Sequence, residues 1–297
     1  MNKILTIIGP TAVGKTKLAI DIAKHLNGEV IGLDSRQIYK EISIGTAKPS
    51  KINLKKIKHH FINHVSIHDD FNVGIFHEQA NKILESLFKK INTVVMVGGS
   101  GLYADSIIYG IDHFPKVKAS VKKQVISLFK NEGLQKLNSM LREHDPEYYR
   151  MVDKNNARRV IRALEVCLSS GKPFISFFKE KRRNNLFKTK ILLMDSKREE
   201  LYKKINKRVD KMISLGLEKE AKEVYKYRNL NSLQTVGYKE FFDYFNEKFT
   251  YKFTIDEIKK NTRRYAKRQT TWNKKYKEVF LVKENYKLNE ILNFINN

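Results

Sequence analysis

Short apolar runs alternate with longer amphipathic segments along most of the chain. The runs typical of buried β-strands lie at residues 3–8, 29–33, 60–65, 92–97, 190–194 and 278–282. Between them, apolar residues recur at helical spacing, most clearly over residues 14–26, 74–90, 197–214 and 255–272. Strands that are separated by helices predict an α/β fold, with a parallel sheet and helices on both of its faces.

The alternation stops in the middle of the chain. The long interval between the fourth and fifth apolar runs contains helical patterns and polar turns, but no convincing strand. We therefore predict an α/β core formed by residues 1–114 and 188–297, with an inserted all-helical domain at residues 115–187.

A glycine-containing segment, GPTAVGKT, joins the first apolar run to the first helical segment. It fits the phosphate-loop pattern G-x-x-x-x-G-K-[ST], which makes the predicted sheet a P-loop-type sheet. In such a loop the backbone N–H groups point inward, and the helix N-terminus adds a partial positive charge. We expect Lys15 to reach a terminal phosphate and Thr16 to hold a Mg²⁺ ion. The predicted phosphate-binding residues are Gly9, Pro10, Thr11, Ala12, Val13, Gly14, Lys15 and Thr16.

The chain is strongly basic, with 58 Lys and Arg against 32 Asp and Glu and a formal net charge of +26. Such an excess favours a nucleic-acid partner, although Lys is abundant throughout and part of the charge belongs to ordinary solvated surface. The densest cluster, residues 263–277, interleaves basic residues with Tyr265, Trp272 and Tyr276, as in proteins that bind unpaired RNA. It predicts RNA contacts by Arg263, Arg264, Lys267 and Arg268. The alternative is a basic amphipathic helix that packs on the core.

Composition excludes several other classes of protein. With 41% hydrophobic and 30% charged residues the chain is globular, and no apolar stretch is long enough for a signal peptide or a membrane span. A single cysteine, Cys167, excludes an internal disulfide and a cysteine-rich zinc site. We therefore expect a cytoplasmic protein without a membrane partner. We also expect a monomer.

Candidate catalytic carboxylates follow two of the apolar runs. Asp34 comes directly after residues 29–33, which places it at the same edge of the sheet as the phosphate loop, where ligands bind in such sheets. It is a candidate general base or metal ligand, and the alternative is a cap for the following turn. Asp195, after residues 190–194, keeps a nucleotide-hydrolysing site open. Histidines 59, 60 and 64 have no Asp or Cys partners nearby, so a metal site there is not favoured.

Several segments together resemble the tRNA dimethylallyltransferase family. They are GPTAVGKT, LDSRQIY, IGTAKP, HHFINHV, VGGSGLY, NARRVIRALE, TVGYKE and TRRYAKRQTTW, which occur in this order over nearly the whole chain. The resemblance implies transfer of a dimethylallyl group from dimethylallyl diphosphate to the exocyclic amine of the adenosine 3′-adjacent to the anticodon. The loop would then hold the diphosphate of a prenyl donor, with Mg²⁺ as cofactor. The single cysteine excludes the zinc finger of eukaryotic relatives.

The resemblance also implies roles for individual residues. Asp34 matches the base that takes the proton of the amine, Ser100 a position that contacts the substrate nucleotide, and Arg208 one that contacts the leaving diphosphate. The anticodon stem-loop of the tRNA would be clasped between the core and the insertion, with the adenine flipped into the pocket. Its contacts would come from Asp34, Ser35, Arg36, Gln37, Ser100, Lys122, Arg158, Arg159, Val160, Ile161, Arg162, Gln234, Thr235, Val236, Gly237, Tyr238 and Lys239.

Two other functions remain compatible with the sequence. One is an RNA-binding P-loop ATPase or small-molecule kinase, in which Asp195 would be the carboxylate for the nucleotide-bound Mg²⁺. The other is a non-catalytic RNA chaperone that uses the loop structurally. The position of Asp195 relative to Thr16 discriminates the nucleotide-hydrolysing alternative from prenyl transfer.

Overall fold

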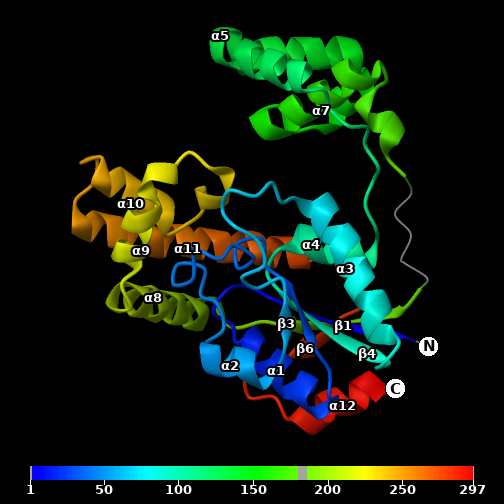
Figure 1. Cartoon of the computed structure of the whole chain (residues 1–297), viewed down its shortest axis with the longest axis vertical. Helices are drawn as coiled ribbons and strands as arrows, with labels where there is room; N and C mark the ends of the chain where they lie inside the picture. The colour runs from blue at the N-terminus through cyan, green and yellow to red at the C-terminus, as the bar shows by residue number, and fades with distance from the viewer. Residues whose placement is uncertain (1, 180–185, 297) are drawn as a thin grey trace. The chain divides into compact units, whose positions relative to one another are not determined.

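The computed structural model describes residues 2–179 and 186–296, and Figure 1 shows its helices and strands. The chain divides into two compact units. The larger unit combines Met1–Gly110 with Arg183–Asn297, and the smaller unit is Ile111–Arg182. No helix in the described part of the chain has both the length and the apolar character that a membrane span requires.

A sheet of parallel strands forms the centre of the larger unit. Its spatial order is β3-β2-β4-β1-β5-β6, and every neighbouring pair is parallel. The strands are β1 (Lys3–Ile8), β2 (Val30–Leu33), β3 (His59–His60), β4 (Thr93–Gly98), β5 (Lys188–Met194) and β6 (Phe280–Val282). The prediction of a parallel α/β sheet is therefore confirmed, and the carboxyl ends of β1, β2 and β4 meet at one edge.

Helices cover both faces of this sheet because its strands are apolar on both sides. In β1, Ile4 and Ile8 belong to the core on one face, whereas Leu5 and Ile7 belong to the core on the other. The first core includes α3 (Val73–Phe88) and α4 (Gly101–Ile108), and the second includes α1 (Lys15–His25) and α12 (Leu288–Asn296). These helices lie on opposite sides of the strands in Figure 1.

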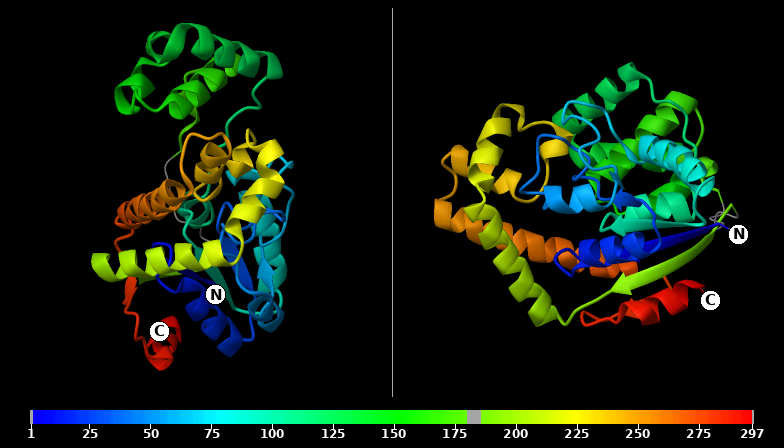
Figure 2. Two further views of the ribbon diagram at one scale, coloured as in Figure 1. Left: turned by 90° about the vertical axis from the view of Figure 1, so that its left-hand side faces the viewer. Right: turned by 60° about the horizontal axis from the view of Figure 1, so that its bottom comes forward.

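Further helices of the larger unit lie beyond the sheet. They are α2 (Lys51–Lys56), α8 (Arg198–Ser214), α9 (Leu217–Val224), α10 (Tyr238–Phe245) and α11 (Tyr251–Asn273). Helix α11 packs against α8 and against α10 (Figure 2). It also contacts α4, whose N-terminus follows β4, so α11 reaches the carboxyl edge of the sheet.

One predicted strand is wrong in most of its length. Residues 60–65 were expected to be extended, but β3 contains only His59–His60. The φ angles of Phe61 and Asn63 are 60° and 52°, a left-handed conformation that a strand cannot contain. Phe61 is buried and packs on Phe76 at a ring distance of 4.8 Å, so the apolar run marks a turn that inserts one side chain into the core.

The smaller unit is all-helical, as predicted for an insertion. It contains α5 (Ala119–His144), α6 (Pro146–Met151), α7 (Ala157–Ser170) and a 3₁₀ turn at Phe174–Phe177. Its own apolar core includes Val125, Leu137 and Leu164. Gly133, with φ of 74°, divides α5 into two helical stretches. The bounds of this unit lie a few residues before the predicted 115–187.

Candidate active site at the carboxyl edge of the sheet

The phosphate loop has the backbone conformation that its glycines permit. Gly9 has φ of 150°, and a Cβ atom there would lie 2.4 Å from the Met194 carbonyl oxygen, so no other residue fits without a shift. Gly14, with φ of 102°, precedes the first turn of α1. The loop is therefore held between β1 and β5, with the N-terminus of α1 behind it.

Lys15 is folded back onto this loop. Its Nζ donates hydrogen bonds to the carbonyl oxygens of Gly9, at 2.9 Å, and Pro10, at 2.7 Å. Burial, and to a smaller extent the charge of Arg208, lower the pKa of Lys15 to about 7 although the carboxylate of Asp34 acts in the opposite direction. The site therefore carries a cation that an incoming anion would stabilise.

A cavity of about 340 Å³ opens beside the loop. Of the predicted phosphate-binding residues it is lined by Thr11, Ala12, Gly14, Lys15 and Thr16. The other three do not line it: Gly9 and Pro10 accept the bonds from Lys15, and Val13 is buried in the apolar core. The remaining lining residues include Lys17, Lys204 and Arg208. This composition suits a small, multiply charged anion.

Arg208 reaches this cavity from α8, almost two hundred residues after the loop in sequence. Its Nη1 donates to the Thr11 hydroxyl at 3.2 Å, and its Nη2 donates to the Ala47 carbonyl oxygen at 3.4 Å. Burial lowers its pKa and Asp34 partly offsets this effect, yet a guanidinium keeps its charge in proteins. Arg208 thus provides a fixed positive charge opposite the loop.

Asp34 occupies the position expected from its place after β2. Its Oδ1 accepts hydrogen bonds from the backbone N–H groups of Arg36, at 2.9 Å, and Gln37, at 3.3 Å. The capping interpretation of Asp34 is therefore confirmed. The side chain also lines the cavity, and its role as a general base or metal ligand stays a prediction. It is the one carboxylate among the residues that line this cavity.

A second cavity, of about 460 Å³, adjoins the first. The two share the lining residues Thr11, Asp34, Thr46, Arg208 and Tyr265. Of the predicted tRNA contacts, the second cavity is also lined by Ser35, Arg36, Gln234, Thr235, Val236, Gly237, Lys239 and Arg268, whereas Gln37 lines the first. Segments that are distant in sequence thus meet around Asp34, between a basic cavity and a mixed one.

Ser100 lines neither of the two cavities. Its Oγ accepts from the Ser35 backbone N–H at 3.0 Å and donates to the Ser35 hydroxyl at 3.3 Å. It also hydrogen-bonds Tyr265, whose pKa is raised by burial and by the negative charge of Asp34. Ser100 therefore fixes two residues that themselves face the second cavity.

Tyr265 and Gln269 belong to the site, although the sequence suggested only a general role in RNA stacking for Tyr265 and none for Gln269. Gln269 Oε1 accepts from the Thr11 backbone N–H at 2.8 Å, and its Nε2 donates to the Gly99 carbonyl oxygen at 3.0 Å. It connects the ends of β1 and β4 to α11. Their spacing of four residues on that helix was the available signal, since it places both side chains on one face.

The remaining predicted tRNA contacts have different exposures. Lys122, Arg158, Arg159 and Arg162 are exposed on the smaller unit. Val160 and Ile161 pack in the apolar core of that unit. The side chain of Tyr238 is fully buried, and its hydroxyl donates to Glu220 at 2.6 Å. Val160 and Tyr238 have no exposed surface, so neither can touch a ligand directly, whereas Ile161 is partly exposed.

The basic residues of α11 also differ from one another. Arg263 donates to Asn206 at 2.8 Å and lies over the Tyr202 ring, so it packs on α8. Arg264, Lys267 and Arg268 are exposed. Tyr276, expected to stack on bases, is instead buried and donates to Asp105 at 2.6 Å. The packing interpretation is confirmed for one face of this segment, and RNA contact by the exposed basic side chains of the other face stays a prediction.

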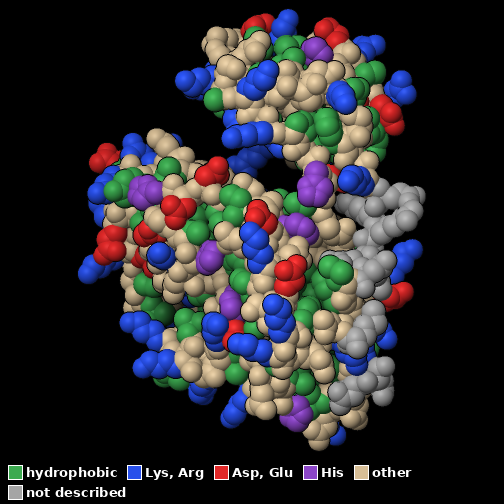
Figure 3. All heavy atoms as spheres, turned by 45° about the vertical axis from the view of Figure 1, so that its right-hand side comes forward, with side chains coloured by type: hydrophobic (Ala, Val, Ile, Leu, Met, Phe, Trp, Pro, Cys, Tyr) green, Lys and Arg blue, Asp and Glu red, His purple; other side chains and the backbone are tan. Residues whose placement is uncertain are grey.

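Basic side chains are also distributed widely over the surface. On the face shown in Figure 3, Lys and Arg side chains are spread over both units, with Asp and Glu side chains among them. Much of the excess positive charge on this face therefore belongs to ordinary solvated surface, as the abundance of Lys indicated.

The position of Asp195 disfavours a nucleotide-hydrolysing site. Its side chain is exposed, accepts from the Ser196 backbone N–H at 2.9 Å, and lines neither cavity. The cavity that Thr16 lines contains Asp34 instead. Asp195 is therefore not placed to be the Mg²⁺ carboxylate that the nucleotide-hydrolysing alternative assigns to it.

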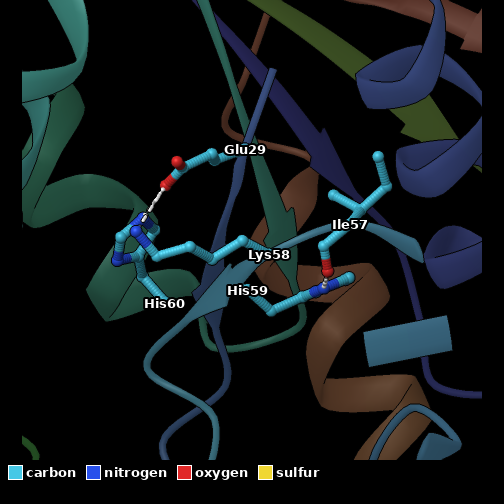
Figure 4. Close-up of polar contacts among 5 residues, drawn as sticks. All are labelled: Glu29, Ile57, Lys58, His59 and His60. Atoms are coloured by element: carbon cyan, nitrogen blue, oxygen red, sulfur yellow. Dashed lines mark hydrogen bonds and ion pairs between the residues drawn. The ribbon is translucent and has the colours of Figure 1, made fainter. Parts of the chain in front are cut away.

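The three neighbouring histidines do not converge on a common point. Figure 4 shows His60 turned toward Glu29, at 2.5 Å, and His59 turned toward the carbonyl oxygen of Ile57, at 2.7 Å. His64 binds Gln79 at 2.7 Å. Within residues 2–179 and 186–296 no group of three His, Cys, Asp or Glu side chains could hold a metal by itself.

Comparison with known proteins identifies relatives over nearly the whole chain. The family model described as IPP transferase matches residues 37–276. The tRNA dimethylallyltransferase of Christiangramia forsetii is 48% identical over 278 residues, which cover 94% of this chain and 92% of that protein. That of Flavobacterium johnsoniae is 42% identical over 301 residues, covering 99% and 97%.

Solved structures agree with this result. A tRNA isopentenylpyrophosphate transferase from Bacillus halodurans is 35% identical, with a TM-score of 0.72 over 100% of this chain and 96% of that chain. A eukaryotic dimethylallyltransferase acting on tRNA is 28% identical, with a TM-score of 0.83 over 96% and 74%. The chain belongs to the tRNA dimethylallyltransferase, or IPP transferase, family.

Proposed function

We propose that this protein transfers the dimethylallyl group of dimethylallyl diphosphate to the exocyclic amine of the adenosine 3′-adjacent to the anticodon of tRNA. One observation carries the proposal beyond family membership. A single carboxylate, Asp34, lines both a basic cavity beside the phosphate loop and a larger mixed cavity next to it. Two cavities that meet at a carboxylate suit a reaction between a diphosphate ester and a second, bulkier substrate.

The basic cavity would bind the diphosphate of the donor. Cleavage of the allylic C–O bond leaves growing negative charge on the diphosphate, and positioned cations and N–H groups stabilise that charge. Lys15, Arg208 and the backbone of the loop provide them. An arriving phosphate would replace the carbonyl oxygens of Gly9 and Pro10 as the partner of Lys15.

The second cavity would receive the flipped adenine. Its exocyclic amine is a weak nucleophile, so a base must accept the proton as the new C–N bond forms. Asp34 is the base in this proposal, because its Oδ1 is fixed by two backbone N–H groups while the side chain faces both cavities. Ser100 holds Ser35 and Tyr265 in place beside it, which makes Ser100 a positioning residue as well as a predicted nucleotide contact.

The residues at the loop also fit a Mg²⁺ ion. Thr16 lines the cavity beside Lys15, and Mg²⁺ characteristically binds few protein groups when phosphates and water complete its coordination. Thr16 would hold the ion together with the diphosphate. Bound there, the ion would neutralise part of the charge on the leaving group.

The exposed arginines and Lys122 of the smaller unit would contact the tRNA, together with residues 34–37, 234–239 and the free face of α11. Contacts from both units are what the clasped anticodon stem-loop of the proposal requires.

All residues that line the two cavities come from one unit of one chain, and we therefore propose a monomer. The cytoplasm, where tRNA is modified, is the proposed location.

The direct test is incubation of the protein with unmodified total tRNA, Mg²⁺ and labelled dimethylallyl diphosphate. We expect label to enter tRNA and diphosphate to be released in equal amounts, with the modified base 3′ of the anticodon. ATP in place of the donor should give no tRNA-stimulated phosphate release. Hydrolysis of ATP without transfer of label would support the ATPase alternative and reject the proposal.

The salt dependence of tRNA binding should separate the basic residues of α11. Replacing Arg264, Lys267 or Arg268 by Gln should each reduce the slope of log K against log salt by about 0.7–0.9 units if it removes one phosphate contact. Arg263→Gln should change the slope less, because Asn206 already binds that guanidinium. Lys252→Gln, which alters an exposed residue in the first turn of α11, is the matched control. A slope equal to that of the wild type in every variant would assign these residues to packing.

Donor binding should be coupled to proton uptake at Lys15. The pKa of Lys15 is lowered to about 7 from 10.5 in the free protein, and a bound diphosphate would raise it again. Below pH 7 Lys15 is already charged, so binding takes up no proton there. Between the pKa of the free protein and the higher pKa of the complex, binding must take up a proton, and affinity falls as pH rises. Calorimetry with inorganic pyrophosphate in buffers of different ionisation enthalpy measures this uptake. Lys15→Arg keeps its charge at every pH tested, so the part of the proton uptake that Lys15 causes should disappear. Proton uptake as large as in the wild type would contradict the assignment to Lys15.

A further inference from the structure

A carboxylate outside the two cavities organises one of their walls. Glu220, on α9, accepts three backbone N–H groups in a row, from Ser43 at 2.8 Å, Ile44 at 2.9 Å and Gly45 at 3.0 Å. Its Oε1 also accepts the hydroxyl of Tyr238 at 2.6 Å. Successive N–H groups that point to one side form an anion-binding concavity, and here the anion is the side chain of the protein itself.

The segment held in this way, residues 43–48, is termed the wall loop. Gly45 lies directly against Tyr238, because a Cβ atom at Gly45 would come within 2.6 Å of the ring. Ala47 has φ of 50°, a left-handed conformation that an alanine adopts only under external constraint. The hydrogen bonds that the Glu220 carboxylate accepts are charge-assisted, and therefore stronger than ordinary backbone bonds. Glu220 and Tyr238 together fix the position and shape of the wall loop.

The wall loop in turn orients residues that face the substrates. Gln37 Nε2 donates to the carbonyl oxygens of Thr46, at 3.0 Å, and Ala47, at 3.2 Å. Arg208 Nη2 donates to the same Ala47 oxygen at 3.4 Å. Thr46 lines both cavities. A displacement of the loop would therefore move the guanidinium opposite the phosphate loop and the turn that Asp34 caps.

We infer that Glu220 is a positioning residue for the transfer reaction, which acts through the wall loop to hold Arg208 and Gln37 in the geometry that the diphosphate and the adenosine require. The inference rests on the proposed function for the reaction itself. The anchoring of the loop by Glu220 is independent of that function. Tyr238 shares the same carboxylate oxygen and supports the same loop from its buried position.

Glu220→Gln tests the inference with almost no change of side-chain shape. One amide oxygen replaces two carboxylate oxygens, and the NH₂ group faces backbone N–H groups that need an acceptor. We expect kcat for transfer to fall about 10–10²-fold, because a misplacement of about 1 Å can cost that much. Pyrophosphate affinity should also fall, while tRNA affinity changes less than about twofold. Amide exchange at residues 43–45 should accelerate, which reports loop release without any catalytic readout.

Two further variants make the test specific. Tyr238→Phe removes one bond to Glu220 and should produce a smaller loss of the same kind, and the double variant should lose less than the product of the two effects, because both act through one loop. Glu223→Gln removes the same charge from an exposed position on α9 and should leave kcat and exchange unchanged.

Distinct outcomes decide between the possibilities. Faster exchange at residues 43–45 with unchanged kcat and pyrophosphate affinity would overturn the inference, and so would equal losses in Glu220→Gln and Glu223→Gln. If Glu220→Gln does not fold, Tyr238→Phe decides by the same measurements. If the wild-type protein transfers no prenyl group, yet Glu220→Gln weakens pyrophosphate binding and releases the loop, the proposed function fails and the positioning of the diphosphate site by Glu220 stands.

Discussion

Asp34→Asn is expected to slow prenyl transfer about 10²–10⁴-fold while tRNA binds within a few-fold of the wild-type affinity. Asparagine retains an oxygen that can accept from the backbone N–H groups of Arg36 and Gln37, so the turn after β2 should persist. What is lost is the ability to take a proton from the adenine amine. Single-turnover rates with saturating donor and tRNA measure this step without product release.

The charge of Asp34 affects the diphosphate site as well, and the experiment must separate the two effects. Asp34 raises the pKa of Lys15 and that of Arg208, so its neutralisation lowers the fraction of charged Lys15 near neutral pH. Donor affinity should therefore be compared well below pH 7, where Lys15 is protonated both with and without the charge of Asp34. At this pH the loss in Asp34→Asn should lie almost entirely in the rate. Asp34→Ala, which also removes the cap of the turn, should lose affinity too. Parallel losses of rate and affinity in Asp34→Asn would assign Asp34 a structural role.

The parts of the site that lie close to one another in sequence were predictable. The phosphate loop combines two glycines, a lysine and a hydroxyl within eight residues, and its function needs only a strand before it and a helix after it. Asp34 was predictable because parallel strands end at one edge of a sheet. The inserted helical domain was predictable because helical periodicity replaces strand patterns over a long interval.

Residues that join the site through tertiary contacts carry no comparable signal. Gln269 binds Thr11 across 258 positions and Gly99 across 170 positions, and nothing local to α11 indicates either partner. Arg208 was found only through the family resemblance, since an arginine on a basic helix is unremarkable in this chain. Glu220 looked like any other surface acid of α9, although it holds three backbone N–H groups.

The strand prediction at residues 60–65 failed for a related reason. The apolar pair Phe61 and Ile62 looks like part of a strand, but it belongs to a turn whose Phe61 is inserted into the core. Likewise Tyr276 satisfies the pattern of an aromatic among basic residues and is nevertheless buried against Asp105. A pattern reports which side chains are buried, and only the backbone path decides which element buries them.

Lys15→Ala is expected to reduce the efficiency of donor use about 10²–10³-fold, the cost typical of removing one positioned donor from a developing anion. Binding of tRNA should be nearly unaffected, because Lys15 lines the cavity beside the phosphate loop and not the second one. The measurement is kcat/KM for dimethylallyl diphosphate together with the dissociation constant of tRNA. A comparable loss of tRNA affinity would mean that Lys15 supports the fold of the loop, to whose carbonyl oxygens it is bound.

The same site predicts which ligands compete with the donor. Five carbons of a prenyl group contribute at most about 4 kcal/mol of burial, at about 0.8 kcal/mol each, so the diphosphate contacts must supply most of the affinity. Inorganic pyrophosphate should therefore inhibit transfer with an affinity close to that of the donor, and Lys15→Ala should weaken both in parallel. ATP should not be hydrolysed, because Asp195 is exposed and lines neither cavity. It should also compete poorly, because a nucleoside triphosphate needs a further pocket for its base and ribose. If ATP instead bound as tightly as pyrophosphate and was hydrolysed when tRNA was added, the cavity would have to accommodate a nucleoside, and the assignment of the loop to a prenyl diphosphate would be wrong.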